Sequence, residues 1–347
     1  MWKIGVNSVV TKDIPDNCRR YSSKRHKTIM KEHNYSIDIL KFLAAILITN
    51  SHMGILYHPY EKFATGGALG DVLFFFCSGF TLFMGKMDRF DNWYKKRITR
   101  IYPTIFAWAL FSSIFFGKHL DAKEQWLIGG GWFISCIMLY YLLLYLIRKY
   151  FIKRLFLVFL VYSLFLLIWY LFEDKTTMFM YGATYFKWGH YFLFMLLGAH
   201  IGSSTKGWTV SLKKDINMLI LSLILFYGLQ YLAQKNIMFS NLQIVTLIPL
   251  CGITIYFYKI CNADFLIRLA KSKIFGRIIG VISALTLEIY LVQTSLFTDT
   301  LNFLFPLNLV IVFVLIILVA YITKVLSRIF SQTFSESPYN WYSIFKI

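Results

Sequence analysis

Charged residues are scarce in this 347-residue sequence, and acidic residues are scarcer than basic ones. Asp, Glu, Lys and Arg make up 15% of the chain, whereas soluble domains average about 25%. Hydrophobic residues account for 58% and aromatic residues for 19%. This composition argues against a soluble α/β or β protein. It favours helices that lie in lipid, with aromatic side chains at the membrane interfaces.

The sequence also lacks the patterns that hold disulfides and metals. It has five cysteines, an odd number, and none forms a C-x-x-C pair. No two of the seven histidines stand four residues apart, and no H-E-x-x-H motif occurs. We therefore expect no disulfide framework, no metal site and no bound cofactor.

No cleavable signal peptide is recognisable at the start of the sequence. Residues 1–34 carry charges throughout and contain no apolar core of about 7–15 residues. We predict that residues 1–35 form a basic cytoplasmic tail. Residues 36–330 are predicted to form one multi-helix transmembrane domain, and residues 331–347 a short cytoplasmic C-terminal tail.

Ten apolar segments are long enough to cross a bilayer, whose core of about 30 Å needs roughly 20 residues of helix. Backbone groups in lipid must be bonded within their own segment, so we expect an all-α bundle of about ten transmembrane helices. The last segment is long and is expected to tilt, or to leave the membrane near Lys324. The predicted spans are Ile37–Tyr57, Gly67–Met84, Ile101–Gly117, Gly131–Ile147, Leu155–Phe172, Tyr185–Gly202, Ile216–Ala233, Leu242–Tyr258, Ile278–Phe297 and Leu304–Phe330.

The distribution of basic residues supports this segmentation. The net charge of +19 would on its own also suit a nucleic-acid-binding protein. However, 29 of the 36 Lys and Arg residues fall on one side of the ten predicted spans and only 6 on the other. Cytoplasmic loops carry such an excess. We expect both termini in the cytoplasm, a plasma-membrane location, contacts with membrane lipids and no nucleic-acid partner.

A pair of small residues, Ser78 and Gly79, interrupts a run of bulky aromatic residues in the second predicted span. Small residues allow two membrane helices to approach closely. Ser78 does not belong to a G-x-S-x-G elbow, because Phe76 occupies the position of the first glycine. We therefore expect close helix packing at this point and no serine nucleophile.

His52 is one of the few ionisable residues inside a predicted span. It lies 11 residues beyond Lys41, which corresponds to about 16 Å of helix and places it in the outer half of the first span. One interpretation is a buried histidine bonded to a neighbouring helix. The other is a general base, because the imidazole of histidine titrates near neutral pH.

Two acidic residues also fall in apolar segments. Glu288 is predicted to lie in mid-membrane, where it needs a polar partner or a neutral, protonated state. Structural and functional roles are both open for it. Asp71 is expected near the start of a helix, where a carboxylate is favoured.

Arg97 and Arg100 stand three residues apart, so they share one face of a helix. The pair is expected at the cytoplasmic end of the third span. It is either a topology signal or a clamp for an anion, because guanidinium groups bind phosphate through paired hydrogen bonds.

Several short motifs follow one another along the sequence, and their order forms a pattern. His52 follows Asp38 by fourteen residues, and the aromatic run with Ser78 and Gly79 comes next. The Arg97-x-x-Arg100 pair precedes Pro103 by three residues. The later motifs are Trp132-Phe133, Leu197-Gly198 and Ser283 through Tyr290-Leu291.

Across residues 36–300 this pattern resembles the acyltransferase 3 family of membrane sugar O-acyltransferases. The sequence departs from the usual motifs at three positions, one of which is Asp71, displaced by one residue from the acidic position seen in some members. Lys41 stands where an arginine is usual, and Gln293 stands where the late motif usually has histidine.

The resemblance implies transfer of an acyl group, usually acetyl, from cytoplasmic acyl-CoA to a sugar hydroxyl. The acceptor would be a surface polysaccharide or its lipid-linked precursor, and acyl-CoA would be a co-substrate. The donor phosphates would bind Arg97, Arg100 and Lys96, and His52 would be the general base. The candidate substrate path comprises Trp132, Glu288, Tyr290 and Gln293.

Two other functions remain open at this point. One is a polysaccharide exporter or flippase that transfers no acyl group. The other is a sensor or scaffold without chemistry, against which the membrane histidine and the arginine pair argue mildly.

Overall fold

The computed structural model describes residues 33–85, 87–117, 131–174, 179–182, 184–204 and 208–346. Within these ranges the chain is helical and contains no β-strand, which confirms the all-α expectation. Nearly all of the predicted N-terminal tail, residues 1–35, lies outside the described residues.

Each of the ten predicted spans contains helix. The long helices are α2 (Tyr35–His52), α3 (Gly67–Met84), α4 (Phe90–Phe116), α5 (Trp132–Phe151), α6 (Leu155–Phe172), α7 (Tyr185–Ser203), α8 (Leu212–Lys235), α10 (Leu247–Cys261), the pair α12 (Phe275–Ala284) and α13 (Thr286–Val292), and α14 (Leu307–Thr333). The short helices are α9 (Ile237–Ser240), α11 (Asp264–Lys271) and α15 (Trp341–Phe345). Single helical turns are η1 (Gly54–Tyr57), η2 (Glu61–Phe63), η4 (Ile152–Arg154), η5 (Gln243–Thr246), η6 (Gln293–Ser295) and η7 (Asp299–Leu304).

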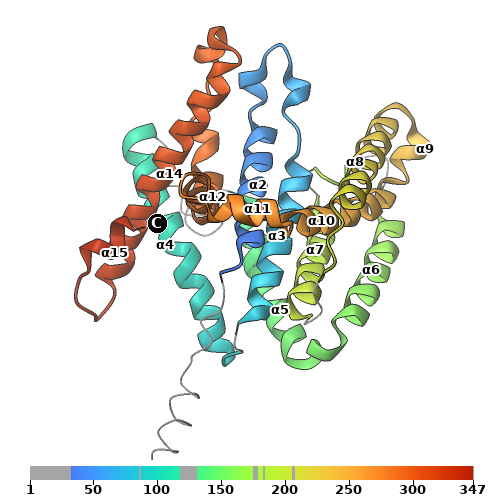
Figure 1. Ribbon diagram of the computed structural model, residues 1–347, viewed down its shortest axis with the longest axis horizontal. Helices are drawn as coiled ribbons and strands as arrows, with labels where there is room; N and C mark the ends of the chain where they lie inside the picture. The colour runs from blue at the N-terminus through green and yellow to red at the C-terminus, as the bar shows by residue number, and fades with distance from the viewer. Residues whose placement is uncertain are drawn as a thin grey trace, which may run out of the picture. The chain divides into compact units, whose positions relative to one another are not determined.

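Ten membrane crossings are not confirmed. Within the described chain, six helical stretches are long and apolar enough to span a membrane, or seven if the bent pair α12–α13 counts as one. The stretch Trp132–Phe172 counts once, although it comprises α5 and α6, which Figure 1 shows as two helices joined by a turn. These findings support a multi-pass membrane protein.

Helices α2 and α7 are not among these six stretches, and their packing explains why. Most residues of α7 are buried against neighbouring helices, and α2 buries much of its length against α3 and α12. A helix enclosed by protein does not need the uniformly apolar sequence that lipid demands. Both helices therefore carry polar side chains, including Lys41 and the buried Thr49 on α2.

The outer helices have the opposite character. Helix α6 buries only Leu155, Leu166 and Tyr170, whereas Leu171 and Phe172 are 64% and 86% exposed. Large apolar side chains are also exposed along α8 and α14. Such continuous apolar surface belongs in contact with lipid.

Helices α3 and α7 approach so closely that only glycine fits at their contact (Figure 1). A Cβ atom added to Gly79 would lie 1.9 Å from the carbonyl oxygen of Met195, and one added to Gly198 would lie 2.1 Å from that of Phe76. The expected close packing at Gly79 is confirmed, with α7 as the partner helix.

The predicted span Ile278–Phe297 is not one straight helix. Helices α12 and α13 meet at Leu285 with a bend of 63°, and η6 follows α13. Broken helices are tolerated at membrane depth where they are buried in protein or line a cavity. Both conditions apply, because α2 packs against both halves and the break borders the cavity described below.

Candidate active site

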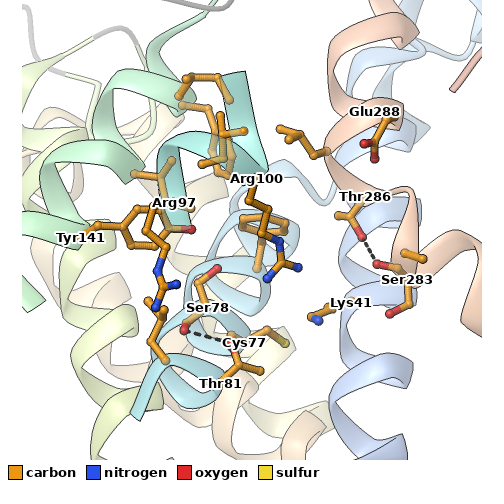
Figure 2. Close-up of a pocket in the computed structure, with 18 of the residues that line it drawn as sticks. Lys41, Cys77, Ser78, Thr81, Arg97, Arg100, Tyr141, Ser283, Thr286 and Glu288 are labelled. Atoms are coloured by element: carbon orange, nitrogen blue, oxygen red, sulfur yellow. Dashed lines mark hydrogen bonds between the residues drawn. The ribbon is translucent and has the colours of Figure 1, made fainter. Parts of the chain in front are cut away.

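A cavity of about 250 Å³ lies among α2, α3, α4, α5, α12, α13 and α14. Four cationic side chains line it: Lys41 from α2, Arg97 and Arg100 from α4, and Lys324 from α14. Figure 2 shows the two arginines reaching from α4 into the space that Lys41 borders on the opposite side. One carboxylate, Glu288 on α13, also lines the cavity.

Arg97 is held by aromatic rings rather than by a carboxylate. Its guanidinium carbon lies 4.3 Å from the centre of the Trp93 ring and 5.9 Å from that of Tyr141. Within the described part of the chain, neither Arg97 nor Arg100 forms an ion pair with an acidic residue. Cation–π contacts fix the position of a guanidinium without neutralising its charge, so both groups remain available to an anion.

Lys324 is already paired. Its Nζ donates to Oε1 of Glu288 at 2.7 Å, and the hydroxyl of Thr104 donates to the same oxygen at 3.2 Å. Glu288 is fully buried, and its Oε2 has no hydrogen-bond partner among the described residues. Of the two states considered for Glu288, the structure provides the polar partner. Helix α14 continues past Lys324 to Thr333.

Lys41 and Lys324 were not predicted as cavity residues. A lysine inside an apolar helix is costly in lipid, and that cost was the signal that both residues face a partner or a cavity. On α2, one turn before Lys41, Asp38 accepts a hydrogen bond from the hydroxyl of Ser283 at 3.1 Å. This bond attaches α2 to α12 at the edge of the cavity.

Lys96 lies outside this arrangement. It is exposed, does not line the cavity and forms an ion pair with Asp88. The hydrogen bond from Lys96 lowers the pKa of Asp88. The structure therefore separates Lys96 from Arg97 and Arg100, with which the sequence grouped it.

His52 is the last residue of α2 and does not line the cavity either. The side-chain amide nitrogen of Gln293, on η6, lies 2.9 Å from Nδ1 of His52. Gln293 is buried, whereas His52 is exposed. His52 thus combines a bond to a neighbouring element with access from outside the protein, and its role as a base stays a prediction.

Aromatic residues surround the region between the cavity and His52. Trp132 stacks on Tyr191 at 5.6 Å, and Phe133 contacts Tyr290 at 4.9 Å between ring centres. Phe133 also lines the cavity. The first turn of α5 therefore joins the edge of the cavity to α7 and α13 through ring contacts.

Lys187 on α7 was also missed by the sequence interpretation. Its ammonium lies 4.0 Å from the centre of the Trp132 ring. Its charge acts on His52 and on Asp71, which is buried in α3. Asp71 stands in the second turn of α3, close to the expected position at a helix start.

Comparison with known proteins gives one match. A family model described as an acyltransferase domain, Acyl_transf_3, matches residues 34–325, which include every candidate site residue above. No curated protein and no solved structure matches the chain.

Proposed function

The chain belongs to the Acyl_transf_3 family of acyltransferases, and we propose that it transfers an acetyl group from acetyl-CoA to a sugar hydroxyl. The acceptor is a surface polysaccharide or its lipid-linked precursor. In this proposal the protein is an O-acetyltransferase of the plasma membrane with both termini in the cytoplasm, as the distribution of its basic residues favours.

The observation that carries the proposal is the convergence of cationic groups on one cavity. Acyl-CoA is a polyanion, and its phosphates match guanidinium and ammonium groups in charge and geometry. Among the described residues, Arg97, Arg100 and Lys41 have no carboxylate partner at the cavity, so they supply the uncompensated charge. Because acyl-CoA is cytosolic, this end of the protein is assigned to the cytoplasmic side.

The donor then extends along α2 toward His52. Lys41 and His52 are 11 residues apart, about 16 Å along the helix. The pantetheine arm has to cover this distance past Phe133 and Leu287, which line the cavity on the side of α5 and α13. Their apolar surfaces suit an uncharged arm.

His52 acts as the general base in this mechanism. Its free ring nitrogen takes the proton of the acceptor hydroxyl while that oxygen bonds to the thioester carbonyl carbon. The carbon–sulfur bond then breaks, and the leaving sulfur takes the proton back from His52. An ester and a free thiol result, so the imidazole returns to its starting state. Trp132 and Tyr290 offer aromatic faces for the sugar ring near this point.

The test uses purified protein in detergent with radiolabelled acetyl-CoA and a lipid-linked glycan acceptor. We expect His52→Ala to lower transfer by about 10²–10⁴-fold. His58→Ala is the matched control, because His58 is an exposed histidine six residues away that bonds Glu61. Full activity in His52→Ala would remove the proposed base. Absence of transfer by wild-type protein, combined with glycan movement across vesicles, would favour an exporter.

A further inference from the structure

We propose that Gln293 is a positioning residue that holds His52 in the tautomer protonated on Nδ1, so that Nε2 is the nitrogen that accepts the hydroxyl proton. The inference rests on the proposed function, in which His52 is the base. It concerns a residue at which the sequence departs from the family motif.

The contact between the two side chains is specific. The amide of Gln293 lies 2.9 Å from Nδ1 of a histidine 241 residues away in the sequence. Gln293 is only 1% exposed, so its amide is fixed within the protein. Nε2 of His52 has no hydrogen-bond partner within the described ranges. The glutamine therefore occupies the inner nitrogen and leaves the outer one to the acceptor.

The orientation of the amide decides which nitrogen carries the proton. With the amide nitrogen toward the ring, it donates to Nδ1, and a neutral imidazole then carries its proton on Nε2. Such a ring presents a donor to the acceptor hydroxyl and cannot take its proton. The amide oxygen is buried with no partner among the described residues, and rotation would put the amide nitrogen in the same place, so this position does not distinguish the two orientations.

Rotating the amide of Gln293 by 180° exchanges its oxygen and its nitrogen. The two groups have nearly the same size, so the orientation is assigned from the hydrogen bonds that each can form. The oxygen then accepts from Nδ1–H, and Nε2 keeps a free electron pair. The same bond also suits the imidazolium that forms after proton transfer, because Nδ1 is protonated in both states. Only this orientation allows His52 to accept the hydroxyl proton on Nε2 and to return it afterwards.

A neutral amide differs from a carboxylate at this position because it orients the ring without adding charge. The charged groups around His52 come from other helices: Lys187 on α7 acts on His52, and Asp71 on α3 acts on Lys187. Gln293 therefore sets the tautomer, while these two residues set the local electrostatic potential.

Three variants test the proposal through steady-state kinetics over pH. Gln293→Leu removes the acceptor, and kcat should fall at least about tenfold, within the roughly 10⁴-fold that a wrong tautomer costs elsewhere. The KM for acetyl-CoA should not change. Gln293→Glu keeps an acceptor on Nδ1 and adds a charge that stabilises imidazolium, so the acid limb of the pH–rate profile should move up by about one pH unit. Gln243→Leu removes another buried glutamine, one bonded to Met180 and Ser240, and should leave the profile in place.

A spectroscopic measurement separates this inference from the proposed function. Ring ¹⁵N spectra of histidine-labelled wild-type protein, minus those of His52→Ala, should show His52 protonated on Nδ1 and unprotonated on Nε2. The Nδ1–H signal should weaken in Gln293→Leu. An Nε2–H signal in the wild type, or unchanged kcat in Gln293→Leu, would overturn the role of Gln293 even if His52→Ala is inactive. An active His52→Ala variant would overturn the proposed function instead.

Discussion

The two ends of α2 are built for different tasks. At the Lys41 end, cationic groups from three helices surround a cavity, and three of the four lack a carboxylate partner in the part of the chain that the structure describes. At the His52 end, the neutral side-chain amide of Gln293 contacts the imidazole ring, and no ion pair of His52 is found among the described residues. Charge binds and orients an anionic donor, whereas proton transfer needs a ring in a defined state. In the proposed mechanism, a helix of eighteen residues keeps the two functions apart.

The largest effect is expected on thermal stability, when the ion pair between Lys324 and Glu288 is broken. Lys324→Ala leaves Glu288 buried without its counter-charge, which typically costs about 3–5 kcal/mol. The midpoint of thermal unfolding in detergent should drop sharply, and Lys213→Ala on the exposed face of α8 should leave it unchanged. Replacing both partners, Glu288→Met with Lys324→Met, should recover most of the loss. No recovery in the double variant would assign the cost to packing rather than charge.

Removing a cation from the cavity should affect only the donor. Arg97→Ala deletes a charged hydrogen-bond donor worth about 1.5–3 kcal/mol, so the KM for acetyl-CoA should rise by roughly 10–150-fold. The KM for the glycan should stay the same. Arg89→Ala is the control, since Arg89 is exposed and paired with Asp91. A similar rise in both KM values would show that Arg97 does not act on the donor alone.

Replacing Trp132 should raise the KM for the glycan rather than the KM for acetyl-CoA. Trp132→Ala removes the ring on which Lys187 rests, and the KM for the glycan should rise by roughly fivefold, or about 1 kcal/mol. The KM for acetyl-CoA should not move. Trp208→Ala, near Tyr258, tests for a general effect of losing a tryptophan. If the donor KM rises instead, Trp132 belongs to the donor path.

The smallest effect is expected for Lys96, next in sequence to Arg97. It is exposed and paired with Asp88, and surface ion pairs contribute little. Lys96→Ala should leave the KM for acetyl-CoA within experimental error at physiological salt. A rise comparable to that of Arg97→Ala would place Lys96 in the donor site and extend the cationic end beyond the cavity.

Local sequence patterns predicted much of this architecture. Apolar runs located the helices, because each segment that contacts lipid must itself be apolar. The spacing of Arg97 and Arg100 predicted that they share a face, because helix geometry is local. The count of ten crossings was less secure, since enclosed helices such as α2 and α7 need not look like lipid-facing ones.

The pairings that complete the site could not be predicted in the same way. Lys324 meets Glu288 from 36 residues away, and Gln293 meets His52 from 241 residues away. Nothing in either local sequence identifies its partner, because the fold alone brings them together. The bend between α12 and α13 was missed because the run from Ile278 to Phe297 is predominantly apolar, and the polar residues within it, such as Glu288 and Gln293, do not mark where a helix bends.

The cavity draws its side chains from both the beginning and the end of the helical region. Lys41 enters with the first described helix, while Lys324 arrives only with α14. During synthesis, Glu288 therefore has no Lys324 to pair with until α14 has been made and has packed against the other helices. A nascent or shortened chain that stops before α14 would expose a buried acid in lipid, which gives membrane quality control a means of recognising an unfinished enzyme.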